Sequence, residues 1–136
     1  MAGMRGFAHL DEVLRQALNA AALRQQVAAN NIANVNTPGF RRQSVRFEEQ
    51  LQRARSRAAV AGRTTHPRHV PVGVQPVAPP RVVTERSTVM RNDGNNVDVE
   101  REMAVLAAAE TQYAALTQVV AARYRMLRSA ISQGGR

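Results

Sequence analysis

The sequence predicts a mainly α-helical protein in which two long helices, one at each end of the chain, pack antiparallel as a coiled-coil-like pair. Three observations predict this fold class. Apolar residues recur at helical spacing near both chain ends, five of the six prolines are confined to residues 62–80, and only 4% of residues are aromatic. Such a composition leaves alanine, valine and leucine to form a thin core, as in packed helices. At 136 residues the chain is one domain at most, built from both ends.

Residues 1–36 are predicted to form the N-terminal long helix. Its main apolar face recurs at intervals of three, four and seven residues, as one face of a helix requires. The face consists of Phe7, Leu10, Leu14, Ala17, Ala21, Ala28, Ile32 and Val35. A second face of mostly small side chains consists of Leu18, Ala22, Ala29 and Ala33. Two such faces imply that this helix packs against more than one partner.

The end of this helix is set by a turn. Pro38 disfavours helical geometry at Thr37, and proline followed by glycine occupies the central positions of a type II turn over residues 37–40. We therefore expect the helix to stop near residues 34–36. The asparagines of this segment are poor in a helix interior, but their amides can donate to the last carbonyls of the helix or to another chain. They are Asn30, Asn31, Asn34 and Asn36.

Residues 37–97 form the middle region, for which we expect a short helix and an extended, β-hairpin-like loop region. Residues 40–47 are predicted to be extended, and 47–59 to form the short helix. Proline and glycine exclude regular helix from 62–80. The valines of 81–90 permit a strand that pairs with 40–47, and a turn over 92–95 follows.

Residues 98–136 are predicted to form the C-terminal long helix. It starts from Asn95, Val97 and Asp98, with Asp98 as the cap, and Gly134 and Gly135 terminate it. A second, small-residue stripe permits close approach of another helix and consists of Ala104, Ala108, Ala115, Val119, Ala122 and Met126. The main packing face consists of Leu106, Ala109, Tyr113, Leu116, Val120, Tyr124, Leu127 and Ile131, to which Leu10, Leu14 and Ile32 are the predicted counterparts.

Two stretches of the chain resemble known sequence signatures. The run Asn30-Asn31-Ile32-Ala33-Asn34-Val35-Asn36-Thr37-Pro38-Gly39-Phe40, preceded by Ala29, resembles the signature of bacterial flagellar axial proteins, the rod, hook and hook-cap-junction family. The segment 93–102, DGNNVDVERE, and the segment 65–71, THPRHVP, are similar to the proximal rod members of that family. The three matches occur in order along nearly the whole chain.

The resemblance implies a structural subunit of the flagellar basal body, at the proximal part of the rod. In this family the terminal helices form an inner tube that lines the export channel, and the residues 30–34 and 36–40 act as the assembly motif. The implied partners are other copies of the chain, other rod proteins, the adaptor protein at the membrane-embedded ring and the flagellar type III export apparatus. The implied location is the periplasm, reached without a cleaved signal peptide and without membrane insertion. No cofactor is implied.

The rival class is a small arginine-rich nucleic-acid-binding protein. The net charge of +9 comes from arginine alone, and eight arginines of the middle region face only Glu48 and Glu49 as opposing charges. They are Arg41, Arg42, Arg46, Arg53, Arg55, Arg57, Arg63 and Arg68. This region lacks interleaved aromatic residues and any recognised binding motif, and an arginine run is usually a solvated face.

Catalytic and metal-binding functions are disfavoured by the residue types. No Ser/His/acid set, carboxylate pair in an apolar context or phosphate-binding loop is visible. His66 and His69 are three residues apart, but Pro67 prevents the helix that would place them on one face, and the chain has no cysteine. We therefore expect no enzyme activity, no metal site and no cofactor.

Overall fold

The computed structural model describes residues 2–49, 51–53, 77–87 and 92–133, with side chains described from His9 onward. It contains α1 (Ala2–Ala33), β1 (Gln43–Arg46), β2 (Arg81–Thr84) and α3 (Val99–Gln133). Residues 48–49 and 51–53 are also helical, where the short helix was predicted. The predicted fold class is confirmed, because two long helices pack together and a small two-stranded sheet lies between them in the chain.

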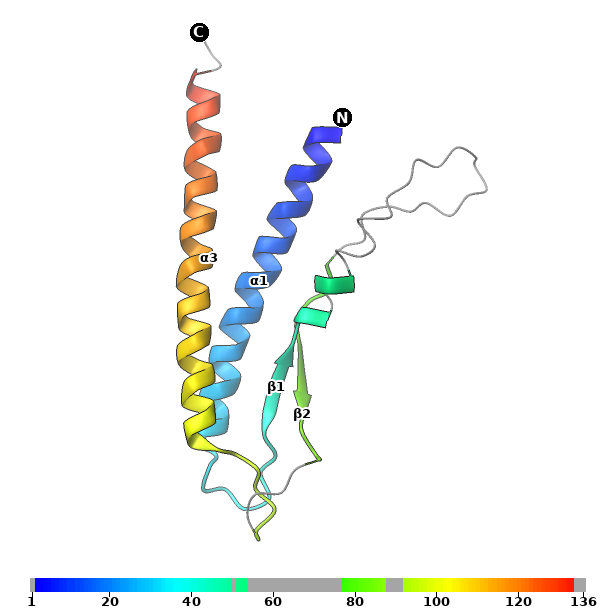
Figure 1. The fold of residues 1–136 in the computed structure, drawn as a ribbon, viewed down its shortest axis with the longest axis vertical. Coiled ribbons are helices and arrows are strands. Elements are labelled where there is room, and N and C mark those ends of the chain that lie inside the picture. The colour runs from blue at the N-terminus through cyan, green and yellow to red at the C-terminus, as the bar shows by residue number, and fades with distance from the viewer. Residues whose placement is uncertain (1, 50, 54–76, 88–91, 134–136) are drawn as a thin grey trace, which may run out of the picture.

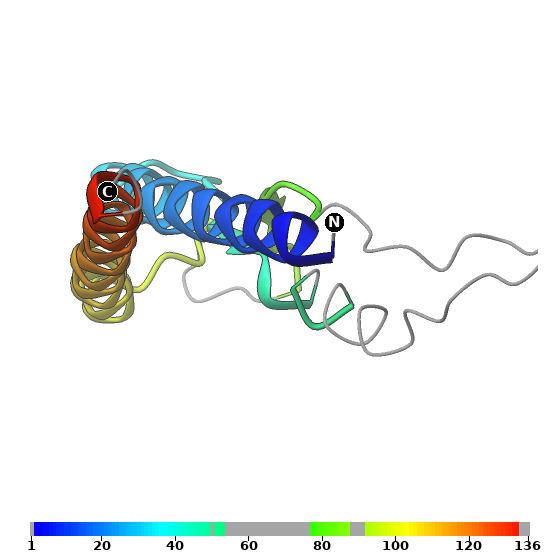
Figure 2. The ribbon, with the colours of Figure 1, turned by 90° about the horizontal axis from the view of Figure 1, so that it is seen from above.

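α1 occupies the middle of the molecule, between α3 on one side and the sheet on the other (Figure 1). α1 and α3 run antiparallel, so both chain ends lie at the same end of the molecule. The two helices are close where α1 ends and α3 begins, and they diverge towards the chain termini (Figures 1 and 2). The pair is therefore closed at one end and open at the other.

The strands pair in the way that the sequence predicts. β1 and β2 are antiparallel, with Gln43 opposite Thr84 and Arg46 opposite Arg81. Each strand has only four residues. The chain between the strands is too long for a tight hairpin, so the sheet joins segments that are distant in sequence.

The apolar core is small and lies mainly between α1 and the chain that follows β1. Ala20, Phe47 and Val77 are buried together, and Val13, Ala17 and Leu51 pack partly buried around them. Ala21 and Ala28 of α1 and Ala109 of α3 are also buried. Burial of Phe47 is worth about 1.5–3 kcal/mol, but the alanines contribute far less each. A core of this kind cannot by itself fix how the elements are arranged.

The end of α1 and the start of α3 agree with the sequence signals. α1 ends at Ala33, and the amide of Phe40 donates to the carbonyl of Thr37 at 3.2 Å. Gly39 has φ +73°, as the third residue of a type II turn requires. At the start of α3, Oδ1 of Asp98 accepts from the amide of Glu100 at 3.0 Å, which is an N-cap bond.

The predicted helix-packing face is only partly buried within one chain. Leu14, Ile32, Leu106, Leu116, Val120 and Leu127 are half-buried. The prediction that Tyr113 and Tyr124 lie in the interior of the pair is wrong for the single chain, and Leu10 and Ile131 are exposed with them. Two causes act together: the helices diverge (Figure 1), and a seven-residue spacing drifts around a straight helix by about 20° per heptad.

Several predicted features lie outside the described residues. These are the remainder of the predicted short helix at 54–59, the loop at 62–76 with His66 and His69, and the terminal glycines. Over the part of the chain that the structure describes, neither long helix has a sufficiently apolar stretch to cross a membrane.

Candidate functional site

Asn31, on the last turn of α1, connects three elements through its side-chain amide. Its Nδ2 donates to the carbonyl of Gln43 at 2.7 Å and to Oε2 of Glu102 at 2.9 Å, and its Oδ1 accepts from the amide of Gln43 at 3.0 Å. The residue is completely buried. Asn31 therefore joins the end of α1 to β1 and to the first turn of α3.

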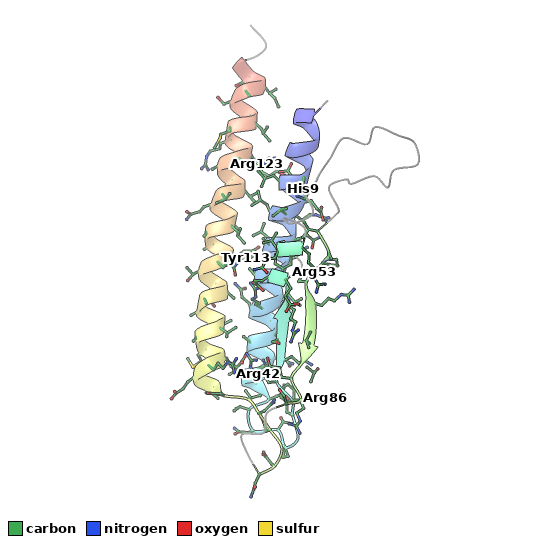
Figure 3. The ribbon with its side chains drawn as sticks, turned by 45° about the vertical axis from the view of Figure 1, so that its right-hand side comes forward. His9, Arg42, Arg53, Arg86, Tyr113 and Arg123 are labelled. Carbon is green, nitrogen blue, oxygen red and sulfur yellow. The ribbon has the colours of Figure 1, made fainter. Side chains whose placement is uncertain are left out.

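Arg42 lies immediately before β1 and is held between two carboxylates. Its Nε donates to Oε1 of Glu102 on α3. Its Nη1 donates at 2.6 Å to Oε1 of Glu85, the residue that follows β2. Arg42 is 6% exposed and Glu102 only 1%. Figure 3 shows Arg42 at the closed end of the helix pair. The buried guanidinium thus ties both strands to the start of α3.

Two neighbouring asparagines complete the arrangement from the segment before α3. Nδ2 of Asn95 donates to the carbonyls of Asn34 at 3.1 Å, Val35 at 3.0 Å and Thr37 at 2.9 Å. These carbonyls belong to the turn that follows the last residue of α1, so Asn95 holds this turn against the segment before α3. Oδ1 of Asn96 accepts from the amide of Arg42 at 2.6 Å, and its Nδ2 donates to the carbonyl of Glu85 at 3.0 Å.

We call this set the polar clasp, and it consists of Asn31, Arg42, Glu85, Asn95, Asn96 and Glu102. All of its members except Glu85 are buried. It gathers the end of α1, the type II turn, both strands and the start of α3 at one end of the molecule (Figure 1). Since each buried polar group has a partner, the clasp satisfies the requirement that buried charges and amides be paired.

Hydrogen bonds within the clasp favour the charged forms of Arg42 and Glu85. Burial alone lowers the pKa of Arg42, but its hydrogen bonds to Glu102 and Glu85 outweigh that effect and leave the pKa raised. Partial burial alone raises the pKa of Glu85, but the hydrogen bond from Arg42 and its charge, with smaller effects of Ser44 and Arg101, hold this pKa below its ordinary value of 4.5. Near neutral pH these two groups therefore form an ion pair.

The clasp brings the two signature stretches of the sequence into contact. Asn31 and Asn34 come from the 30–40 stretch, whereas Asn95, Asn96 and Glu102 come from the 93–102 stretch. Gly39 of the first stretch also donates its amide to the carbonyl of Asp93 at 3.0 Å. Several residues of the two signature stretches therefore stabilise the fold of a single chain.

Most of the remaining predicted motif residues lie on the outside of the clasp, and Val97 is the buried exception among them. Nδ2 of Asn34 donates to the carbonyl of Asn30 at 2.8 Å, which satisfies a carbonyl of the last helical turn. Ile32 and Phe40 are half-buried, and the exposed members are Asn30, Ala33, Asn36, Thr37, Pro38 and Gly39. Val97 is buried, and its amide donates to Oδ1 of Asn95 at 2.8 Å. Their role in assembly stays a prediction.

Sequence reasoning missed four members of the clasp: Arg42, Glu85, Asn96 and Glu102. Arg42 was grouped with a solvated arginine face, which is wrong because two carboxylates compensate its burial. One signal was available for Glu102. It lies four residues before Leu106 and seven before Ala109, in line with the main apolar face of α3, where a lone carboxylate needs a buried partner.

A second feature is a groove at the open end of the helix pair. Its volume is about 450 Å³, and its apolar walls are Leu14 and Leu18 from α1 and Val120 and Tyr124 from α3. Nε of Arg123 pairs with Oδ1 of Asp11 at 2.8 Å across it. Figure 3 shows Arg123 between the two helices. The groove results from the divergence of α1 and α3.

The described residues offer little for other chemistries. They contain no group of three or more His, Cys, Asp or Glu side chains arranged to hold a metal ion. Of the arginines that suggested nucleic-acid binding, Arg42 is buried, whereas Arg46 and Arg53 are exposed. Arg46 lies 3.6 Å from Glu49, so part of this positive charge is balanced within the chain.

Comparison with known proteins gives one consistent result. Residues 12–41 match the family model of the flagella basal body rod protein. The chain is 32% identical over 121 residues to the flagellar basal body rod protein FlgB of Bacillus subtilis strain 168, which covers 89% of this chain and 92% of that protein. It is 37% identical over 118 residues to FlgB of Escherichia coli K12, with coverages of 76% and 81%. For FlgB of Borrelia hermsii the identity is 36% over 115 residues, with coverages of 79% and 84%.

A helix pair with a small apolar core, a structural polar clasp and these relatives define a structural subunit of the flagellar basal body rod. Within that class, the chain belongs to the FlgB family. Neither the relatives nor the family model favours nucleic-acid binding.

Proposed function

We propose that this chain forms the proximal part of the rod by helical assembly with its own copies and with other rod proteins. The observation that carries the proposal is the exposure of α3: residues 111–115, 117–119 and 121 are exposed, although residues 111–122 contain no charged side chain. An uncharged helix face of this length is typical of a surface that another helix covers.

The finer parts of the proposal follow the family. The subunit is exported unprocessed by the flagellar type III apparatus, assembles in the periplasm and contacts the adaptor protein at the membrane-embedded ring. Its long helices line the export channel, and its role is structural rather than catalytic. The polar clasp supports the structural role, because it fixes the direction in which the sheet leaves the helix pair.

The test is complementation of a flagellated host that lacks its own copy of the gene, followed by purification of basal bodies. We expect the chain in the purified rod with its full mass of 14.9 kDa, which shows export without cleavage. Leu116→Asp should remove it from the rod, because this change places a carboxylate on the packing face of α3. Arg53→Asp, at an exposed position of the middle region outside both long helices, is the matched control.

Two results would contradict the proposal. One is the absence of the wild-type chain from purified basal bodies in a host whose motility it restores. The other is equal incorporation of the Leu116→Asp and wild-type chains, since α3 would then contribute nothing to assembly.

A further inference from the structure

The small sheet has one edge that the described residues leave open. On β1, the side-chain amide of Asn31 bonds both the N–H and the carbonyl of Gln43, so α1 covers that edge. β2 lies on the far side of β1 from α1 (Figure 1), and no third strand pairs with it in the described part of the chain. A two-stranded sheet is marginal in water, and an open edge is a template for a further strand.

The strand register shows which backbone groups this edge presents. The amide of Glu85 donates to the carbonyl of Arg42 at 2.8 Å, so these residues form a hydrogen-bonded pair that continues the register of the sheet. Hydrogen-bonded and non-hydrogen-bonded pairs alternate along antiparallel strands. Val82 and Thr84 therefore belong to non-hydrogen-bonded pairs, and their N–H and C=O groups point away from β1. Another extended backbone can pair with this row of donors and acceptors.

Two arginines lie side by side on one face of the same sheet. Arg46 is directly opposite Arg81, and residues in opposite positions share a face. Both are exposed. Among the described residues, Arg46 pairs with Glu49 at 3.6 Å, a long and solvent-exposed contact, and Arg81 forms no ion pair. Like charges directly opposite each other destabilise a sheet, so a carboxylate beside Arg81 would relieve an unfavourable pair.

A second copy of the chain cannot supply that carboxylate from an extended segment. The chain has ten acidic residues, and all of them lie in the described part. Only Glu100 and Glu110 have carboxylates without an ion pair or hydrogen bond to another described residue, and both lie on α3. The net charge of +9 also opposes the approach of a second copy. The carboxylate must therefore come from a different protein.

We propose that the outer edge of β2 receives an extended, acidic segment of a different rod protein. This segment adds a third strand by pairing with Val82 and Thr84, and it places carboxylates beside Arg81 and Arg46. The inference rests on the proposed rod function and specifies the chemistry of one partner. Phosphates of a nucleic acid or a membrane would neutralise the arginines, but they would leave the backbone groups of the edge without partners and the side chain of Val82 44% exposed.

Charge reversal separates docking from folding. Arg81→Glu places a carboxylate opposite Arg46, so the isolated chain should melt at or above the wild-type temperature. The same variant should be lost from purified basal bodies, because its carboxylate repels the acidic segment, whereas Arg81→Lys should be retained. Arg53→Glu makes the same charge change at an exposed position outside the sheet and should also be retained.

Two results of this experiment would overturn the proposal. One is incorporation of Arg81→Glu at the wild-type level, since the charge beside the edge would then be irrelevant to docking. The other is a lower melting temperature of Arg81→Glu, which would contradict the unfavourable pairing of Arg46 with Arg81.

Photo-cross-linking identifies the partner. A benzophenone amino acid replaces Val82 in the chain expressed in a flagellated host, basal bodies are purified after irradiation, and the cross-linked peptide is sequenced by mass spectrometry. We expect a peptide of a different rod protein with acidic side chains at alternate positions, because alternate residues of a strand share a face. The same amino acid in place of Arg53 should not capture this peptide.

Four results would overturn the proposal while leaving the rod function intact: capture of another copy of the chain, of a peptide without acidic residues, or of lipid or nucleic acid, and no product from a Val82 variant that is present in the rod. Where the cross-linker itself keeps the chain out of the rod, the comparison of Arg81→Glu with Arg81→Lys decides. Absence of the wild-type chain from the rod would overturn the proposed function as well.

Discussion

Asn31 and Glu102 are 71 residues apart in the chain, and Nδ2 of the first lies 2.9 Å from Oε2 of the second. This hydrogen bond joins the last turn of α1 to the first turn of α3. Both residues are almost completely inaccessible, at 0% and 1% exposure. The antiparallel pair therefore depends on a polar contact at the end where its buried apolar side chains are small, namely Val27, Ala28, Val97 and Ala109.

Replacement of Glu102 by alanine is expected to destabilise the fold strongly. Arg42 would keep only Glu85 as a counter-ion, and removal of one partner from a buried ion pair costs about 3–5 kcal/mol. Thermal unfolding followed by circular dichroism measures the loss. Glu100→Ala, an exposed position on the same helical turn, is the control, and similar melting of the two variants would show that the buried pair is dispensable.

Asn95→Asp tests the clasp without changing side-chain volume. An ionised aspartate cannot donate to the carbonyls of Asn34, Val35 and Thr37, and each buried group left unpaired costs about 1–3 kcal/mol. We expect a lower melting temperature and faster amide exchange at the end of α1. Asn92→Asp, an exposed change of the same chemistry, should leave both unchanged.

Gly39→Val is expected to strain the type II turn. No atom lies within 4 Å of the position that a Cβ would occupy, so the cost comes from the backbone at φ +73° and not from a clash. A β-branched residue resists this conformation, whereas asparagine tolerates it. We predict that Gly39→Val reduces motility with little change in helix content, and that Gly39→Asn is milder. Equal swimming by Gly39→Val and wild type would show that the turn does not set the subunit geometry.

Acid should weaken the clasp through Glu85. Its pKa is lower in the folded than in the unfolded chain, so the unfolded chain binds more protons and stability falls as the pH drops. The contribution is fully present above the ordinary value of 4.5 and is lost as the pH falls through the lower, folded value. In Glu85→Gln this part of the pH dependence should disappear, which unfolding measured as a function of pH can detect. An unchanged acid profile would argue against the Arg42–Glu85 pair.

Amide exchange in the dilute, isolated chain should reveal a gradient along α3. We expect the strongest protection near the clasp, around Glu102 and Ala109, and weak protection beyond residue 110, where most side chains are exposed. Uniform strong protection up to Gln133 would mean that the open half of α3 needs no partner.

The sequence was sufficient for the helices, the turn and the positions of the two strands because each follows from local chemistry. Pro38 and Gly39 end α1, Asp98 begins α3, and valines mark β2. The clasp could not be predicted in the same way, since nothing local pairs Arg42 with Glu102 across 60 residues. Tyr113 and Tyr124 were misplaced for a related reason: periodicity gives the face of a helix but not the angle at which its partner crosses it.

The distance in sequence between the clasp residues also has a kinetic consequence. The clasp partners of Asn31 and Arg42 lie 54 to 71 positions later in the chain, at Asn96 and Glu102. Closing a loop of n residues costs conformational entropy of order (3/2)RT ln n, which is several kcal/mol at these lengths. The first half of the chain contains Gln43, a partner of Asn31, but it lacks both carboxylates that pair with the guanidinium of Arg42. Formation of the complete clasp must therefore wait for the C-terminal third of the chain.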